Sequence, residues 1–361
     1  MFSTLILNCF IAHAICFAFC SPSPSMMENA SRNASAFFER LRILISTNQN
    51  HSKTSFVKNQ NGVKIAISNW RDLPGPRQIA GRQGAVYFDF KLLNGSRVHL
   101  LVLDLNSVDF ILKPGLSPTT KTTTHQAELN SAAAAINGGF FSLADGTSVS
   151  YVIVDGKELA SPRKNPGLVD NDRISSVRNK IYNRSEMRVL ISDSGQTKVQ
   201  IANHDEPVSP GFRLLHSLQA GPRLLPRMTL EEEAFIRKEA GGTVDVIRSS
   251  HELARTAFGV TPDNHVMLLC VEGGDESVNA GGASLSQVRQ LMASLGCSEA
   301  LNLDGGSSTS MYLVLPDPSG KNKGHTVCRN EPERRVKSVL LLFAAGQPWV
   351  KVKKSGSFSG R

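Results

Sequence analysis

Short apolar or alternating segments, separated by turn-forming residues, dominate the pattern along this chain. The stretch 85–105 predicts two strands joined at Asn94-Gly95, a dipeptide that accepts the positive φ angles of a type I′ turn. A second pair is predicted to turn at Asp155-Gly156, and further strand pairs span 188–203 and 254–274. The pattern therefore indicates a protein built largely from short strands joined by tight turns.

Helical patterns are fewer. The clearest spans 284–297, where a Ser-x-x-Gln capping box precedes an apolar stripe and a glycine supplies the stop. Helices are also predicted within 125–135 and 229–242, whereas the proline-containing segment 113–124 is predicted to be a loop. A final buried strand is expected at 334–345. Many strands and few helices in irregular order favour a single α+β domain, a strand-rich mixed or antiparallel sheet with a few packed helices.

The two ends of the chain differ from its middle. Residues 1–20 resemble a secretory signal, apolar and followed by a Ser/Pro run. We expect a polar lead-in with a possible short helix at 21–61, the compact domain at 62–346 and a basic tail at 347–361. The protein is therefore expected to be secreted, periplasmic or in the cell envelope, with no membrane span after cleavage. An uncleaved N-terminal anchor is the alternative.

The chain has 361 residues and a formal net charge of +9. Its basic residues are scattered and lack the interleaved aromatic residues of nucleic-acid binders, so we expect no nucleic-acid partner and a preference for anionic ligands. Outside the leader only Cys270, Cys297 and Cys328 remain, which allows one internal disulfide at most. Cys297 with Cys328 is the expected pair. The sequence does not indicate the oligomeric state.

The segment "LNLDGGSSTSMYL" at 301–313 places one carboxylate and several small residues between two apolar runs. Asp304 follows a short predicted strand, Gly305 and Gly306 allow close approach to the backbone, and the hydroxyls that follow, Ser307 and Ser308 first, offer donors to an anion or a sugar. A tight turn capped by the aspartate explains the segment equally well. No Walker loop, Gly-x-Ser-x-Gly elbow or histidine ligand spacing occurs, so we expect no metal and no cofactor.

Polar residues stand at the ends of four other apolar runs. Asn137, Gly138 and Gly139 follow one run, Arg255 precedes another, Glu272 ends a third and Arg335 opens the last. Taken singly, each has an ordinary explanation as a strand end or a surface residue. A cleft lined by strand ends would gather all of them.

Together these segments resemble the phosphodiester glycosidases, in order, from about Val98 to Phe343. "INGGFF", "QAGPRLL", "ARTAFGV", "LNLDGGSSTSM" and "ERRVKSVLLLF" are each similar to a family motif. The chain departs from the family where Ser307 replaces a third glycine, Ala254 a frequent proline and Gly274 an arginine. The resemblance implies hydrolysis of a sugar-1-phosphodiester at the anomeric carbon.

The resemblance also suggests roles for individual residues. Asp304 is expected to orient or activate water or to counter the oxocarbenium charge, with Glu272 as the second carboxylate and Arg255 on the phosphate. The expected substrate-binding groups are Asn137, Gly138, Gly139, Thr256, Gly305, Gly306, Ser307, Ser308 and Arg335. Two alternatives stay open: a glycan- or phosphoglycan-binding protein without turnover, and a factor that processes exopolysaccharide or envelope polymers.

Overall fold

The computed structural model describes residues 55–59, 61–107, 110–239, 241–273 and 281–345. The signal expected at 1–20, most of the lead-in, Gly274 and the basic tail lie outside the described residues. Within the described ranges, no helix combines the length and apolar character that a bilayer span requires.

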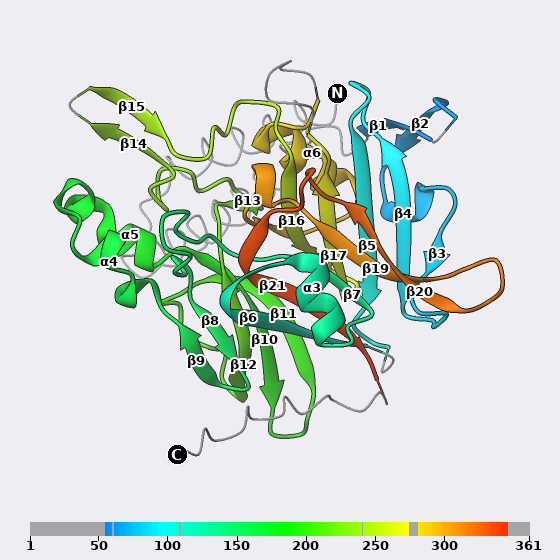
Figure 1. Cartoon of the computed structure of the whole chain (residues 1–361), viewed down its shortest axis with the longest axis horizontal. Helices are drawn as coiled ribbons and strands as arrows, with labels where there is room; N and C mark the ends of the chain where they lie inside the picture. The colour runs from blue at the N-terminus through cyan, green and yellow to red at the C-terminus, as the bar shows by residue number, and fades with distance from the viewer. Residues whose placement is uncertain (1–54, 60, 108–109, 240, 274–280, 346–361) are drawn as a thin grey trace, which may run out of the picture. The chain divides into compact units, whose positions relative to one another are not determined.

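The largest element is a nine-stranded sheet with the order β13-β18-β16-β17-β5-β4-β1-β2, to which β3 adds at β4 (Figure 1). In that order its strands are Arg223–Leu225, Glu299–Asn302, Arg255–Val260, His265–Val271, Arg97–Asp104, Ala85–Lys91, Ser55–Lys58 and Lys64–Ile67, with β3 at Arg77–Gln78. Strand β1 thus lies ahead of Gly62, where the sequence predicted the domain to start.

A five-stranded sheet of order β20-β19-β7-β21-β6 carries the segments around Asn137 and Arg335. Its strands are Asn322–Cys328, Met311–Pro316, Ala134–Asn137, Arg335–Ala344 and Phe110–Thr122. A second five-stranded sheet, β11-β10-β12-β8-β9, comprises Thr197–Asn203, Ser185–Ser192, Phe212–Gln219, Val152–Val154 and Lys157–Ala160. A separate hairpin consists of β14 (Ile236–Glu239) and β15 (Gly242–Asp245).

Helices are short. They are α3 (Thr123–Leu129), α4 (Pro166–Val169), α5 (Arg178–Tyr182) and α6 (Leu285–Ser294), with single 3-10 turns at Trp70–Asp72, Pro162–Lys164, Asp172–Val177 and Gly306–Ser308. The capping box of α6 forms as predicted, with Ser284 as N-cap and Gln287 reaching back to it. The described strand pairs are all antiparallel. The fold is therefore mostly β, a narrower description than the expected α+β class with a mixed sheet.

The nine-stranded sheet is covered on both faces. On one face Tyr87, Leu101 and Leu268 pack with residues of both five-stranded sheets, such as Leu340 and Leu218. On the other face a separate apolar cluster joins strands β5 and β17 to the apolar side of α6. Because both faces are buried, these strands have continuous apolar sequences rather than an alternating pattern.

Two predictions from local signals were wrong. The proline-containing segment expected to be a loop is part of β6, which pairs with β21 at the edge of its sheet. An edge strand tolerates proline because one side of its backbone has no ladder partner. The helix predicted at 229–242 is a turn followed by β14. There Glu233 is buried and accepts hydrogen bonds from Ser185, Thr229 and the amide of Arg223, so tertiary contacts override helix propensity.

Of the two predicted hairpin turns, one forms as expected and the other does not. The hairpin at Asp155-Gly156 forms with positive φ at both residues, 52° and 73°. At Asn94-Gly95 the strands also pair, but five residues separate Lys91 from Arg97 and only the glycine has positive φ, so this is a longer loop than the predicted type I′ turn.

All three expected cysteines are free thiols. Cys328 is hydrogen-bonded with Cys270, not bridged to Cys297, which lies in the other core cluster against Met267.

Candidate active site

Segments far apart in the sequence meet around the buried side chain of Asn137, at the end of β7. Its Oδ1 accepts a hydrogen bond from Thr256 Oγ1 at 2.8 Å and from the amide of Ser310 at 3.1 Å. Its Nδ2 donates to the carbonyl of Asp304 at 2.6 Å. Asn137 and Thr256 are both 0% exposed and join these segments around the Asp304 loop. Their expected role in substrate binding stays a prediction.

Asp304 leaves β18 into this loop. Its amide donates to the carbonyl of Gly138 at 3.1 Å, and its Oδ1 accepts the amide of Gly305 at 3.0 Å. Burial raises the pKa of the Asp304 carboxyl to about 6, although hydrogen bonds from Ser308 and Gly305 and the charge of Arg334 act in the opposite direction. A carboxyl with such a pKa exchanges a proton near neutral pH, as acid–base chemistry requires.

The backbone around Asp304 is closely packed. Gly306 has φ of +55°, and its amide donates to the carbonyl of Ala254 at 2.8 Å. Gly273 touches the same segment from the other side: a Cβ there would lie 2.7 Å from the amide nitrogen of Ala254. Side chains at Gly306 and Gly273 would strain or displace the loop, so the glycines bring the ends of β16, β17 and β18 together.

The glycine amides expected to hold a sugar are used within the protein. Gly138 donates to the carbonyl of Ser338 at 2.9 Å, and Gly139 donates to Ser338 Oγ at 3.0 Å. Gly305 and Gly306 donate to Asp304 and Ala254, as described above. Each of these four amides therefore already has a hydrogen-bond acceptor within the protein.

Arg255, which was expected to bind the phosphate, already has many partners within the protein. Its guanidinium is buried and donates to four backbone carbonyls, those of Ala283, Ile247, Arg248 and His251, at 2.8–3.0 Å. Burial lowers the pKa of Arg255 to about 10. Arg255 lies beside the Asp304 loop, since a Cβ on Gly305 would be 3.8 Å from its Cδ. Arg255 thus holds the surrounding loops together, and its expected role at the phosphate stays a prediction.

Glu272 belongs to a chain of polar side chains on the sheet face that bears the main core. His99 Nε2 lies 2.8 Å from Glu272 Oε1, and His99 Nδ1 lies 2.6 Å from the hydroxyl of Tyr87. Cys270 is the cross-strand partner of His99. His99 is fully buried, whereas the Glu272 side chain is 37% exposed. The Glu272 carboxylate is therefore the solvent-exposed end of a buried row of hydrogen-bonded side chains, Tyr87, His99 and Glu272.

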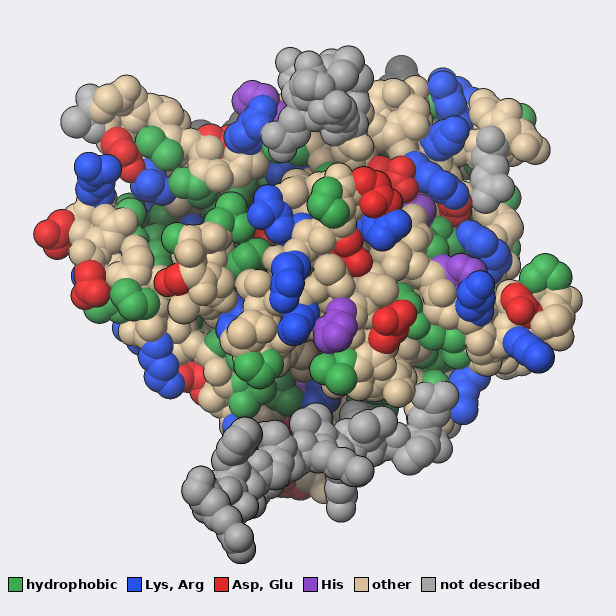
Figure 2. Space-filling model, in the orientation of Figure 1, with side chains coloured by type: hydrophobic (Ala, Val, Ile, Leu, Met, Phe, Trp, Pro, Cys, Tyr) green, Lys and Arg blue, Asp and Glu red, His purple; other side chains and the backbone are tan. Residues whose placement is uncertain are grey.

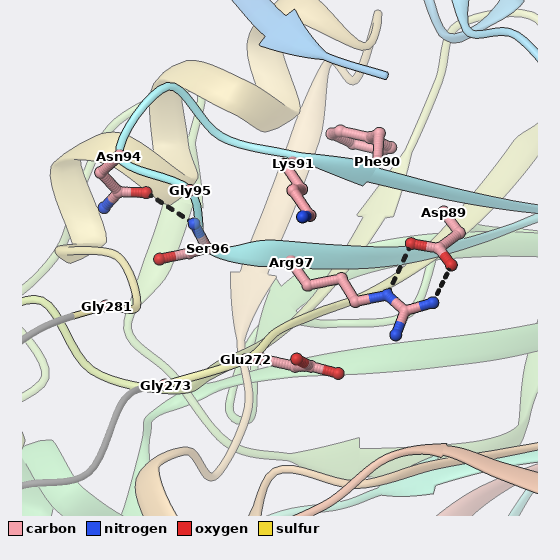
Figure 3. A pocket seen from close by; sticks show the side chains of 10 residues that line it. All are labelled: Asp89, Phe90, Lys91, Asn94, Gly95, Ser96, Arg97, Glu272, Gly273 and Gly281. Atoms are coloured by element: carbon pink, nitrogen blue, oxygen red, sulfur yellow. Dashed lines mark hydrogen bonds and ion pairs between the residues drawn. The ribbon is translucent and has the colours of Figure 1, made fainter. Parts of the chain in front are cut away.

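Two hollows meet at this carboxylate. A pocket of about 660 Å³ is lined by Glu272, Lys91, Asn94 and Arg97, the last of which is paired with Asp89 (Figure 3). A smaller hollow of about 110 Å³ lies between Glu272, Cys328 and Thr309. Gly273 lines both, and it also lines a third and larger cleft.

The larger cleft, of about 1320 Å³, is lined by both basic and acidic side chains. The acidic ones are Asp145, Glu331 and Glu333, and Glu331 is paired with Arg329 at 2.7 Å. Arg329, Arg334, Arg335 and Lys337 line the cleft, with Ser307 at the end nearest the Asp304 loop. Arg334 donates to Ser307 Oγ at 3.1 Å, and Arg335 Nε donates to the carbonyl of Thr120 at 3.0 Å. Elsewhere, basic and acidic side chains are interspersed over the face in view (Figure 2). The cleft is therefore a suitable place for an anionic group.

A family model described as phosphodiester glycosidase matches residues 130–343. The chain belongs to this family. The segments around Asn137, Arg255, Glu272 and Asp304 all lie within the matched range. The resemblance inferred from the motifs is thereby confirmed.

Two solved structures resemble this chain at low sequence identity. A hypothetical protein from Synechocystis is 17% identical over 81% of this chain and 68% of its own, with a TM-score of 0.51. The zebrafish N-acetylglucosamine-1-phosphodiester alpha-N-acetylglucosaminidase catalytic domain, auto-inhibited by its pro-peptide, is 16% identical over 80% of this chain and 81% of its own, with a TM-score of 0.48. No curated protein matches the sequence.

Two side chains that contact the candidate site residues were not expected from the sequence. Arg334 acts on Asp304 through its charge, whereas only its neighbour Arg335 was expected to be part of the site, as a substrate-binding residue. His99 connects Glu272 to Tyr87. The sequence could have indicated that His99 has polar partners, because "VHLLVL" places a histidine inside an otherwise apolar strand and a fully buried histidine needs hydrogen-bond partners.

Proposed function

We propose that this protein hydrolyses a sugar-1-phosphodiester and releases a free sugar and a phosphomonoester. The observation that supports this most strongly is the cleft lined by Arg334 and Arg335, which reaches the Asp304 loop at Ser307. The charge of Arg334 acts on the Asp304 carboxyl, whose pKa is about 6. Cations beside a buried carboxyl suit a substrate that combines a phosphate with a reacting sugar carbon.

In the proposed reaction the phosphodiester lies in the cleft, with Arg334 and Arg335 on its oxygens. The bond between the anomeric carbon and the phosphate oxygen breaks, and the phosphate leaves with the electron pair. Water adds its oxygen to the anomeric carbon and gives up a proton to Asp304 or to solvent. Phosphate is a good leaving group, so charge stabilisation matters more than strong acid assistance.

Asp304→Asn tests the proposal, with Asp193→Asn at the exposed β10–β11 turn as the matched control. An aryl phosphodiester of N-acetylglucosamine is a convenient substrate. We expect Asp304→Asn to lower kcat/KM by roughly 10²–10⁴-fold, the usual contribution of a positioned acid or base, and the control to remain at the wild-type value. Unchanged turnover in Asp304→Asn would refute the assignment.

Hydrolysis in ¹⁸O-labelled water tests which bond breaks. We expect the label in the released sugar and not in the phosphomonoester. Label in the phosphate would mean cleavage at phosphorus and would contradict the proposed reaction. Saturable binding of the substrate with no turnover would favour the phosphoglycan-binding alternative, and release only from polymers would favour the exopolysaccharide alternative.

We further propose that the protein acts outside the cytoplasm, on the basis of the signal-like residues 1–20. N-terminal sequencing of the protein from its native host should show a chain that begins after Ala18 or Cys20. An intact N-terminus on a protein retained in the cytoplasm would contradict this.

A further inference from the structure

We propose that His99, Glu272 and Cys328 form a binding site for a zinc-class divalent metal ion. Their ligand atoms, an imidazole nitrogen, a carboxylate oxygen and a thiol sulfur, all lie within 4.8 Å of one another. The three residues come from β5, the end of β17 and the end of β20, so no local spacing in the sequence reveals the cluster. This inference does not depend on the proposed hydrolysis.

The ligand types select the metal. A Cys–His–carboxylate set is typical of zinc, and the thiolate disfavours Mg²⁺ and Ca²⁺. Around a tetrahedral zinc ion, ligand atoms lie about 3.3–3.8 Å apart. His99 Nε2 and Glu272 Oε1 are now 2.8 Å apart and hydrogen-bonded, so an ion would enter by replacing that bond with two bonds to metal and drawing in the sulfur.

The charge balance suits a mostly buried position. His99 and Cys328 are buried, and only Glu272 reaches solvent. A divalent ion with one carboxylate, one thiolate and a neutral imidazole has no net charge, which keeps the cost of burial small. Binding would release one proton, from the Cys328 thiol, to solvent.

The surroundings provide the support that metal-bound histidines have in other proteins. Tyr87 Oη lies 2.6 Å from His99 Nδ1 and can accept the Nδ1 proton, which leaves the Nε2 lone pair free for a metal. The residues around His99 in β5, and those opposite it in the neighbouring strand β17, are buried, so the imidazole is held in place by packing.

A fourth coordination position is available on the open side. Glu272 and Cys328 both line the hollow of about 110 Å³, together with Thr309 and Asn330. This is room enough for a water molecule. The site is thus three-coordinate from the protein with one position left open, the arrangement of catalytic rather than structural zinc sites.

The experiment is titration of Co²⁺ into chelator-treated, full-length protein, followed by thiolate-to-cobalt charge-transfer absorption. We expect one equivalent to bind with that absorption in the wild type and in Cys297→Ser, whose thiol lies in the other core cluster. Cys328→Ser should abolish the absorption, and His99→Gln should weaken binding at least tenfold. Zn²⁺ should displace the cobalt, and excess Mg²⁺ should not.

Several results would overturn the proposal. These are no charge-transfer absorption in the wild type, the same absorption in Cys328→Ser, or its loss in Cys270→Ser but not in Cys328→Ser. Near-ultraviolet circular dichroism checks that the variants fold. If Cys328→Ser does not fold, X-ray absorption of the zinc-loaded wild type decides instead. One sulfur with nitrogen and oxygen ligands supports the site, and a shell without sulfur refutes it.

Discussion

Glu186 and Glu272 are each paired with a histidine, and they differ in what else surrounds them. Glu186, in the sheet of β10, is 0% exposed and accepts hydrogen bonds from Arg188 at 2.7 Å, His204 at 2.9 Å and Ser217 at 3.3 Å. Glu272 has His99 at 2.8 Å, and its side chain is 37% exposed and opens into two hollows.

Arginines show the same contrast. Arg188 and Arg255 are both buried and donate chiefly to backbone carbonyls. Arg334 is exposed and lines the large cleft. A buried charged side chain whose hydrogen-bonding groups are all paired within the protein stabilises the fold. A charged side chain with hydrogen-bonding groups that face a cavity can bind a ligand. Residue type alone does not separate the two.

The largest expected effect is a loss of stability on substitution of Glu186, the fully buried carboxylate. Glu186→Gln leaves Arg188 buried without its charged partner, and we expect a loss of about 3–5 kcal/mol in the free energy of unfolding. Glu272→Gln, which changes the partly exposed carboxylate, should lower the free energy of unfolding by less than about 1 kcal/mol. Urea unfolding of both variants measures this. Equal losses would remove the distinction between the two carboxylates.

Arg255 should behave like a structural residue. Arg255→Met removes four charge-assisted hydrogen bonds to carbonyls, and we expect a loss of roughly 2–4 kcal/mol in the free energy of unfolding. Arg334→Met should change stability by less than about 0.5 kcal/mol. If thermal unfolding shows Arg255→Met to be as stable as the wild type while phosphate binding is lost, Arg255 is a ligand-binding residue after all.

Arg334 should affect activity instead. We expect Arg334→Met to lower kcat/KM for a sugar phosphodiester by roughly 10–100-fold, the worth of one charge-assisted hydrogen bond of about 1.5–3 kcal/mol. Most of the loss should be in KM if the contact is made equally in the ground state. Arg213→Met, an exposed arginine of β12, is the control. A loss of the same size in Arg213→Met would show a general charge effect.

The smallest effect is the pH dependence of stability through Asp304. Because its folded-state pKa is about 6 and its ordinary value is 3.8, the folded protein holds this proton more tightly. The contribution of this protonated carboxyl to the free energy of unfolding is fully present below pH 3.8 and is lost as the pH rises through about 6. We expect about 1–2 kcal/mol, measured as the difference between wild type and Asp304→Asn across this range. A difference that does not change with pH would contradict the raised pKa.

The pH profile of activity gives the same group a second test. If ionised Asp304 accepts the proton of water, kcat/KM should rise with pH around a midpoint near 6. A profile that falls through this range would assign Asp304 to the acid role instead.

Local signals were sufficient where one segment decides its own structure. The capping box and apolar stripe of α6, the Asp155-Gly156 turn and the buried strands β16 and β17 all formed as the pattern predicted. They failed where a neighbour changes the outcome. A proline-containing strand is stable only because β21 supplies a ladder at the sheet edge, and the helix at 229–242 gives way to the contacts of Glu233.

By itself, the sequence determined the family and the segments that meet at the site, because motifs and their order survive in the linear chain. It did not determine what each side chain does there. The bonding of Asn137 and Arg255 within the protein, the cations beside Asp304 and the meeting of His99, Glu272 and Cys328 depend on contacts between residues distant in sequence. Such contacts, and the access of water to them, are set only when the sheets pack together.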